Sequence, residues 1–593
     1  MNKFYAILIA LFAFSGLHAQ NVVTITDADL GSDTYNWTSD NIYLLDGFVF
    51  LEEGGILNIE AGTVIKGKEA PSTSDNASAL IITRGAQIFA SGNEDAPIIF
   101  TAEIDDTSIA DDLTPNDRGL WGGLIILGKA QIANPTAETR IEGIPEGESR
   151  ALFGGMDDTD NSGSLSYVSI RHGGAELSPG DEINGLTLGA VGSGTTLDHI
   201  EVLANSDDGI EFFGGTVSLK FATVGFCGDD SYDWDLGYRG KGQFWFAILG
   251  DDDGDNGGEL DGARPDDGEP TSNPTIYNAT FIGAGCNSTA SNSNAMLFRD
   301  GTAGTFANSI FTEFNFGVEV EDRATGVDSR QRYEDGDLVL ANSLWYNFCN
   351  GNELNAGDNG FIRVTGDAED PTAQWLIDGL AAAGNALDNP NLGGISRATD
   401  GGLDPRPEFG GAAYGSLADL PDDSFFQVTS YKGAFGASQW LRNWTAIDEY
   451  GLLSDETIGG GCDAPIIIGD DDIVGGATYN WTNDNCYILD GFVFVEAGAV
   501  LNIQAGTVIK GRETPSTGDN ASALIITRGA TINAEGNGDA PIIFTAEIDD
   551  TTDPDDLTPN DRGLWGGLII LGNAQIANPT AETRIEGIPE GEP

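Results

Sequence analysis

The stretch that decides the fold runs from Asn205 to Lys241 and reads NSDDGIEFFGGTVSLKFATVGFCGDDSYDWDLGYRGK. Its acid residues recur 22 positions later, with Asn205 and Asp235 alongside. The recurring acids are Asp207, Asp208 and Glu211, answered by Asp229, Asp230 and Asp233. The apolar residues just upstream keep the same offset, as Leu197, Ile200 and Val202 are answered by Leu219, Ala222 and Val224. This repeat predicts two successive turns of one coil.

Equivalent residues on successive turns are expected to lie about 4.8 Å apart, side chain over side chain. Two carboxylates at about 5 Å repel by about 3 kcal/mol at an effective dielectric near 20. Either a hard cation between the acids or exposure to water must relieve this repulsion, and a third possibility is catalysis by paired carboxylates. We expect Ca²⁺ as the cation, because it takes six to eight oxygen ligands. The predicted metal residues are Asp207, Asp208, Glu211, Asp229, Asp230, Asp233 and Asp235.

A six-residue pattern with apolar first and sixth positions and a small or apolar fourth position recurs along the chain. It occurs at Leu165–Ile170, Leu197–Val202, Leu219–Val224, Ile276–Phe281, Phe306–Phe311 and Leu340–Trp345. The third position holds a ring in the first three copies and Asn in the last three. Short apolar runs upstream, such as Ile56–Ile59 and Ile98–Thr101, read as strands. Together they predict an all-β parallel β-helix with stacked ladders inside it.

The largest repeat is a tandem duplication. Residues 34–148 reappear as 478–592 with only 19 differences. We expect a signal peptide over 1–19, a β-helix module over 20–453, a linker over 454–466 and a second, truncated module over 467–593, with Pro593 ending a fragment. Within the first module we expect one helix, Thr372–Ala383, started by Asp370 and Pro371. The segment Phe425–Leu453 is expected to close the end of the coil.

Composition limits the possible partners and compartments. The chain has 593 residues and a net charge of −67, which argues against binding nucleic acid. No segment of the mature chain is apolar and long enough to span a membrane. We therefore expect a secreted or cell-surface protein. Of the five cysteines, Cys462 and Cys486 are expected to pair, whereas Cys227, Cys286 and Cys349 are expected in the interior.

Several motifs resemble those of secreted β-helix proteins of the Bacteroidetes, a group within the pectate-lyase-like superfamily. They are AGTVIKG (61–67), APIIFT (96–101), GLWGG (119–123), the two acid runs, and YKGAF (431–435) with Trp440 and Trp444. The resemblance implies a right-handed parallel β-helix on or outside the cell, in a group that often carries a sorting domain for type IX secretion. It implies no particular reaction.

Part of the same stretch is similar to polygalacturonase-type glycoside hydrolases of this superfamily. Their Asn-Thr-Asp, Gly-Asp-Asp and Arg-x-Lys motifs correspond to 205–207, 228–230 and 239–241. The Gly-His-Gly that should follow is missing, since His172 and His199 both lie upstream. Arg239 also follows Asp230 by only nine residues, too few to reach a later turn.

Further candidate residues surround the repeat. Asp251, Asp253, Asp255 and Glu259 form a possible second calcium loop, although the spacing is not that of an EF-hand. Trp234, Arg239 and Lys241 are possible ligand-binding residues, and His199 is expected to stack as a ring of its ladder. Our leading hypothesis is a non-enzymatic protein, stabilised by cations, that acts in adhesion or polysaccharide binding. The alternative is a polysaccharide hydrolase or lyase that uses Asp207–Asp235.

Overall fold

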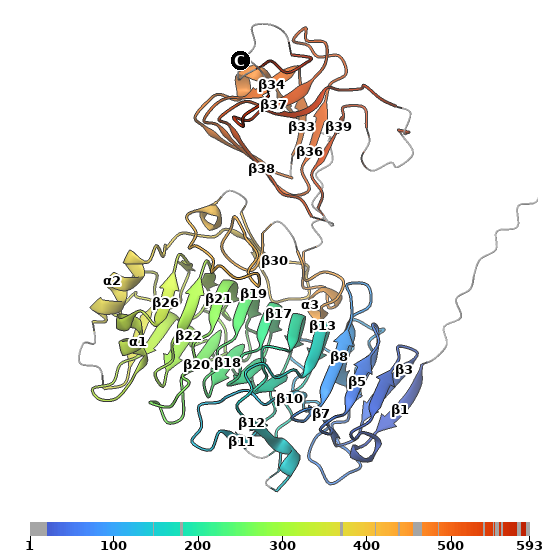
Figure 1. The fold of residues 1–593 in the computed structure, drawn as a ribbon, viewed down its shortest axis with the longest axis vertical. Coiled ribbons are helices and arrows are strands. Elements are labelled where there is room, and N and C mark those ends of the chain that lie inside the picture. The colour runs from blue at the N-terminus through green and yellow to red at the C-terminus, as the bar shows by residue number, and fades with distance from the viewer. Residues whose placement is uncertain are drawn as a thin grey trace, which may run out of the picture.

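The computed structural model describes residues 20–588 except 146, 178–181, 368–371, 409–410, 437–438, 455–464, 484, 538–539, 550, 552–556, 559–560 and 578–582. The predicted signal peptide, the predicted helix start at Asp370 and Pro371, and most of the predicted linker lie outside the described residues. The first copy is an all-β coil of parallel strands, which confirms the predicted parallel β-helix (Figure 1).

One sheet of the first copy follows the coil from its first strand to its last turns. Its main path runs through β1 (Asn21–Ile25), β3 (Asn41–Leu45), β6 (Val64–Gly67), β9 (Ile98–Ala102), β13 (Gly163–Arg171), β15 (Thr196–Leu203), β17 (Ser218–Gly225), β19 (Lys241–Ile248), β21 (Thr275–Ile282), β23 (Gly304–Ala307) and β26 (Leu338–Ala341). It also includes β2 (Thr34–Trp37), β5 (Ile56–Ile59), β8 (Gln87–Ser91), β24 (Ile310–Thr312) and β27 (Leu344–Tyr346).

A second sheet carries the acid residues. Its strands are β4 (Phe48–Leu51), β7 (Ala79–Ile82), β10 (Leu124–Leu127), β14 (Leu186–Gly189), β16 (Ile210–Phe213), β18 (Tyr232–Asp235), β20 (Gly258–Asp261), β22 (Asn294–Arg299), β25 (Phe316–Glu321) and β28 (Ile362–Thr365). The antiparallel hairpins β11 (Glu138–Arg140) with β12 (Leu152–Gly154) and β29 (Leu392–Ile395) with β30 (Leu403–Pro407) lie outside both sheets.

The helices of the described residues are few and short. They are α1 (Ser329–Asp335), α2 (Gln374–Ala382) and α3 (Ala446–Glu449), with 3₁₀ turns at Asp27–Asp29, Ser149–Ala151, Ala412–Tyr414 and Asp470–Asp472. The predicted helix over 372–383 corresponds to α2. No helix of the described residues is long and apolar enough to cross a membrane.

The third position of the six-residue pattern bends each long strand. Tyr167, His199 and Phe221 have φ of 50°, 52° and 55°, and Asn308 in a later turn has 54°. This left-handed conformation costs roughly 1–2 kcal/mol for most residues but is tolerated by Asn. The rings offset that cost by stacking, with centroids 4.2 Å apart for Tyr167 and His199 and 4.4 Å for His199 and Phe221.

The ring ladder lies on the outside of the coil, beneath the closing segment. Trp440 and Trp444 meet His199 edge-on, with ring centroids 6.1 and 5.7 Å away. This corrects the expectation of a ladder inside the coil. The lumen is instead filled by a continuous apolar core that runs from Ile25 to Leu380.

The closing segment Phe425–Leu453 covers the side of the coil, which corrects the expectation that it closes the end. The backbone N–H groups of Ala446 and Ile447 donate to Glu201 on β15, at 2.7 and 3.2 Å. The fully buried Arg171 on β13 pairs with Glu449 at 2.6 Å. Because Glu201 and Arg171 are buried and each has a partner in the segment, they fix the segment along two successive turns.

Strand β19 lies on a turn of the coil that the six-residue pattern did not predict. It pairs Gly242 with Leu219 and Trp245 with Ala222. A Cβ at Gly242 would lie 2.6 Å from the Trp245 ring, so the indole fills the space that an apolar residue holds in the other turns. The exchange keeps the core packed while it breaks the pattern.

The second copy repeats the strands of the first in three separate parallel sheets. They are β31 (Ile466–Ile468), β33 (Cys486–Leu489), β36 (Val508–Gly511) and β39 (Ile543–Ala546); β32 (Thr478–Trp481), β35 (Val500–Ile503) and β38 (Thr531–Ala534); and β34 (Phe492–Val495), β37 (Ala523–Ile526) and β40 (Gly567–Ile570).

The cysteines only partly match expectation. Cys286 and Cys349 form a disulfide between two loops, so the prediction that both are interior thiols is wrong. Cys227 is free and buried, as predicted. Cys486 is disulfide-bonded, and its predicted partner, Cys462, lies outside the described residues.

Removing the first-copy disulfide with the double substitution Cys286→Ser and Cys349→Ser should lower the free energy of unfolding. The bond closes a loop of 63 residues, for which chain entropy predicts a loss of about 4 kcal/mol. Denaturant unfolding followed by tryptophan fluorescence measures the loss. An unfolding midpoint that stays the same in both the double variant and the reduced wild type would contradict this account.

Candidate metal centre

The acid residues stack on successive strands, as the 22-residue repeat predicted, and they lie on the outer face of the second sheet, which the repeat did not predict. Glu211 on β16 pairs in register with Asp233 on β18, which pairs with Glu259 on β20. Side chains alternate along a strand. The residues next to them, Phe212 and Trp234, therefore point into the core, where both are buried. Burial of these neighbours fixes the direction in which the acids point.

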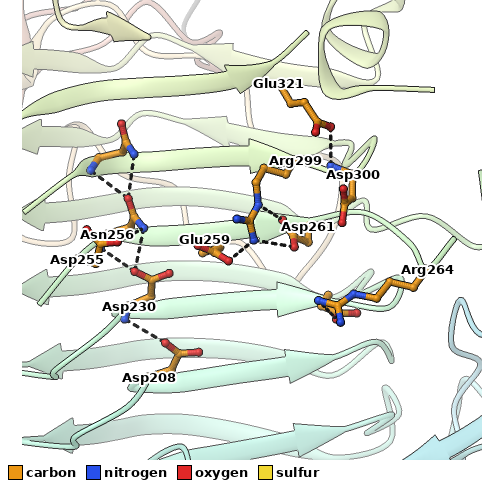
Figure 2. A network of polar contacts seen from close by, with 12 residues as sticks. Asp208, Asp230, Asp255, Asn256, Glu259, Asp261, Arg264, Arg299, Asp300 and Glu321 are labelled. Carbon is orange, nitrogen blue, oxygen red and sulfur yellow. Dashed lines mark hydrogen bonds and ion pairs between the residues drawn. The ribbon is translucent and has the colours of Figure 1, made fainter. Parts of the chain in front are cut away.

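A second ladder lies in the turn before these strands and alternates between acids and amides. The backbone N–H of Asp230 donates to Asp208 at 3.0 Å. Asn256 donates both its backbone N–H, at 2.6 Å, and its side-chain amide, at 3.0 Å, to Asp230. Asn294 donates to Asn256 in the same way, with both distances 3.0 Å. Figure 2 shows Asp208, Asp230 and Asn256 in a line joined by these bonds.

Asn184 occupies the equivalent turn one coil earlier, before β14. The backbone N–H of Gly185 donates to the Asp208 carbonyl, which sets the register between the two turns. The Asn184 side-chain amide donates to Glu211. Its carbonyl oxygen is buried and has no hydrogen-bond partner. The ladder therefore reads Asn, Asp, Asp, Asn, Asn from residue 184 to residue 294.

The two ladders together form groups of three carboxylates that could each hold a metal ion. The ligand atoms within each group lie within 4.8 Å of one another. Two groups lie on the sheet, namely Asp208–Glu211–Asp233 and Asp230–Asp233–Glu259. Two lie further out on the turns, namely Asp207–Asp208–Asp229 and Asp229–Asp230–Asp255. Carboxylate oxygens at this spacing suit a hard cation such as Ca²⁺.

Burial makes these carboxylates costly as anions. Desolvation, and then the neighbouring carboxylates, raise the pKa of Asp208, Glu211 and Asp230 well above the usual range. The half-buried Asp207 has its pKa raised to about 7 by desolvation and by the charges of Glu142 and Asp229. A carboxyl pKa raised by folding means that the folded state loses stability as pH rises through the carboxyl range, unless a cation compensates.

Arginines neutralise the downstream half of the ladder. Arg299 on β22 pairs with Glu259 and donates two bonds of 3.0 Å to Asp261 (Figure 2). Arg264 pairs with Asp235 at 3.2 Å, although burial still raises the pKa of Asp235 to about 7. Within the described ranges, no Lys or Arg forms an ion pair with Asp208, Glu211, Asp230 or Asp233.

The residues of the predicted second calcium loop separate in the structure. Asp252 within that loop pairs with Arg118 at 2.8 Å. Asp255 and Glu259 join the groups of the main ladder. Asp251 and Asp253 are exposed and belong to none of the acid groups found among the described residues. The loop thus contributes two residues to the ladder rather than forming a cluster of its own.

The side chains of the predicted ligand-binding residues do not face the ladder. Trp234 is 1% exposed and donates its indole N–H to Thr302 at 3.1 Å, so it has no free face for a sugar. Arg239 pairs with Asp158 at 2.9 Å and also donates to the Gln131 carbonyl at 3.1 Å. Lys241 pairs with Asp423.

The sequence repeat did not reveal Asn184, Asn256, Asp261 or Arg299. Asn184 precedes Asp208 by 24 residues and Asn256 follows Asp230 by 26, so neither keeps the offset of 22. Because the turns differ in length, a search at a fixed offset of 22 residues does not find Asn184 or Asn256. A search for any Asn or Asp one strand pairing away from Asp208 would have found them.

Comparison with known proteins places these coils in a family. A family model described as a pectate-lyase-like beta helix domain matches residues 30–374 and 476–590. The first match contains both ladders, and the second falls on the repeated copy. No curated protein matches the chain.

The double substitution Asp208→Asn and Asp230→Asn should stabilise the protein when a chelator is present. An amide at 208 can donate to the unpartnered Asn184 oxygen, and both substitutions remove a buried charge. We expect a gain of about 1 kcal/mol per site, the net contribution of one added hydrogen bond. Thermal unfolding at pH 7 in chelator measures it.

The matched control is Asp253→Asn, which makes the same chemical change at an exposed acid and should leave the unfolding temperature unchanged. A lower unfolding temperature for the double variant in chelator would show that the ionised carboxylates stabilise the fold by themselves.

Proposed function

Because the chain belongs to the pectate-lyase-like β-helix family, we propose that it is a secreted or surface-displayed, non-enzymatic protein that acts in adhesion or polysaccharide binding. A divalent cation, Ca²⁺, bound at Asp208, Glu211 and Asp233 stabilises its coil. The first observation behind the proposal is the set of carboxylates in the upstream half of the ladder, with which no Lys or Arg of the described chain forms an ion pair.

The energetic argument for a cation follows from the spacing of the acids. Two charges within 4.8 Å of each other repel by about 3 kcal/mol at an effective dielectric near 20. The group of Asp208, Glu211 and Asp233 contains three such pairs. A divalent cation turns each repulsion into a bridged contact and meets the preference of Ca²⁺ for carboxylate oxygen.

The positions of the basic and imidazole groups support a non-enzymatic role over the alternative of a polysaccharide hydrolase or lyase. That alternative places Arg239 or Lys241 beside the acids, whereas each is paired with a different aspartate elsewhere. His172 contacts Tyr450 at 2.7 Å, beneath the closing segment. His199 is held in the ring ladder.

Location outside the cytoplasm is supported by the disulfide between Cys286 and Cys349, because such bonds persist in oxidising compartments. The net charge of −67 suits a medium rich in divalent cations. The tandem copy supports adhesion, since linked copies raise avidity without any new contact.

The cation site is tested by calorimetric titration of Ca²⁺ into chelator-treated full chain. We expect saturable binding with a dissociation constant of about 10⁻⁴ M, as in extracellular calcium modules. Glu211→Gln should abolish that binding, whereas Asp253→Asn should retain it. Loss of binding in Asp253→Asn alone would move the site to the exposed loop, and equal binding in all three proteins would refute the ladder as a metal site.

Polysaccharide binding is tested by affinity electrophoresis in gels that contain polygalacturonate or alginate. We expect retarded migration in Ca²⁺, because a bound cation can bridge an acidic protein to carboxylated sugars. The same mixtures are assayed for new reducing ends and for unsaturated uronate ends. Release of either kind of end at a rate that Glu211→Gln abolishes would contradict the non-enzymatic proposal and support the enzyme.

A further inference from the structure

The two acid groups on the sheet differ in one respect that decides what each can bind. They share Asp233 and are displaced by one turn of the coil. In the upstream group, the remaining members are Asp208 and Glu211. In the downstream group, Glu259 is already paired with Arg299.

We propose that Arg299 takes the place of a second cation on the sheet, so that the two sheet groups together bind one divalent ion, at Asp208, Glu211 and Asp233. This inference rests on the proposed function, because it assumes that the ladder binds a cation. It adds the number of ions that the two sheet groups bind, the position of the bound ion, and the residue that prevents a second ion from binding.

The position of Arg299 supports this role. Asp261 on β20 pairs in register with Arg299 on β22, so the arginine lies one turn beyond the acids. Its guanidinium reaches back between Glu259 and Asp261 and contacts both (Figure 2). A cation at Asp230, Asp233 and Glu259 would have to displace this contact and would carry its charge next to a fixed positive charge.

An independent observation marks the upstream group as the one that takes the ion. Asn184 is 1% exposed, and its side-chain oxygen has no partner. Its side-chain nitrogen contacts Glu211, which places the carboxamide beside the upstream group. A rotation of the carboxamide by half a turn would present the oxygen to a cation held there, and side-chain carbonyls of Asn are common calcium ligands. Asn184 is therefore assigned as a neutral ligand of the upstream ion.

The experiment is equilibrium dialysis of the full chain against saturating Ca²⁺, which counts the bound ions per chain. Relative to wild type, Glu211→Gln should bind one ion fewer and Glu259→Gln should bind the same number. Arg299→Gln should bind one ion more, and adding Glu259→Gln to it should return the count to that of wild type. Asn184→Leu should weaken the wild-type site about tenfold.

The matched control is Arg323→Gln. Arg323 pairs with Asp266, Asp300 and Glu321 but with no member of either group, so its loss should leave the count unchanged. If Arg299→Gln does not fold, the contrast between Glu211→Gln and Glu259→Gln still decides the question. A loss of one ion in both of these variants, or an unchanged count in folded Arg299→Gln, overturns the role of Arg299. An unchanged count in Glu211→Gln overturns the proposed cation site itself.

Discussion

The structure depends on one constraint: successive turns of the coil pair in register, so equivalent residues lie directly over one another. Glu211, Asp233 and Glu259 follow this register on one sheet, and Tyr167, His199 and Phe221 follow it on the other. Each residue meets the equivalent residue of the next turn about 4.8 Å away. Apolar residues and rings gain from this arrangement, and amides gain because each is both donor and acceptor. Like charges are the exception, because stacking in register makes them repel each other.

The turn ladder shows both outcomes at one position. Asn256 and Asn294 continue the chain of hydrogen bonds without charge. Asp208 and Asp230 accept the backbone N–H of the next turn but, when ionised, have no proton to donate to the turn before. The carboxylates are therefore in the least favourable place for a purely structural residue. Their occurrence there favours a requirement for negative charge, which connects the ladder to cation binding.

Much of the coil could be predicted because apolar residues recur at equivalent positions of its turns. The six pattern matches fall on paired strands of one sheet, and the acid repeat predicted the stacking of Glu211 on Asp233. The pattern did not predict a strand in which one side chain fills the space left by another position, as Trp245 does over Gly242. The sequence also could not show which face of the coil Phe425–Leu453 covers, nor that Cys286 meets Cys349 across two loops. The metal ion itself stays a prediction.

The closing segment has a consequence for how the coil comes apart. Repeat proteins whose units touch only their neighbours can fray from an end, one unit at a time. Here the segment is bonded to Glu201 on β15, to Thr280 on β21 and to the Asn308 carbonyl beyond β23. The segment links these turns, because no turn beneath it can unfold until the segment has also lost its hydrogen bonds to the others. Unfolding of these turns is therefore expected to be cooperative, as in a globular domain, rather than stepwise from the end.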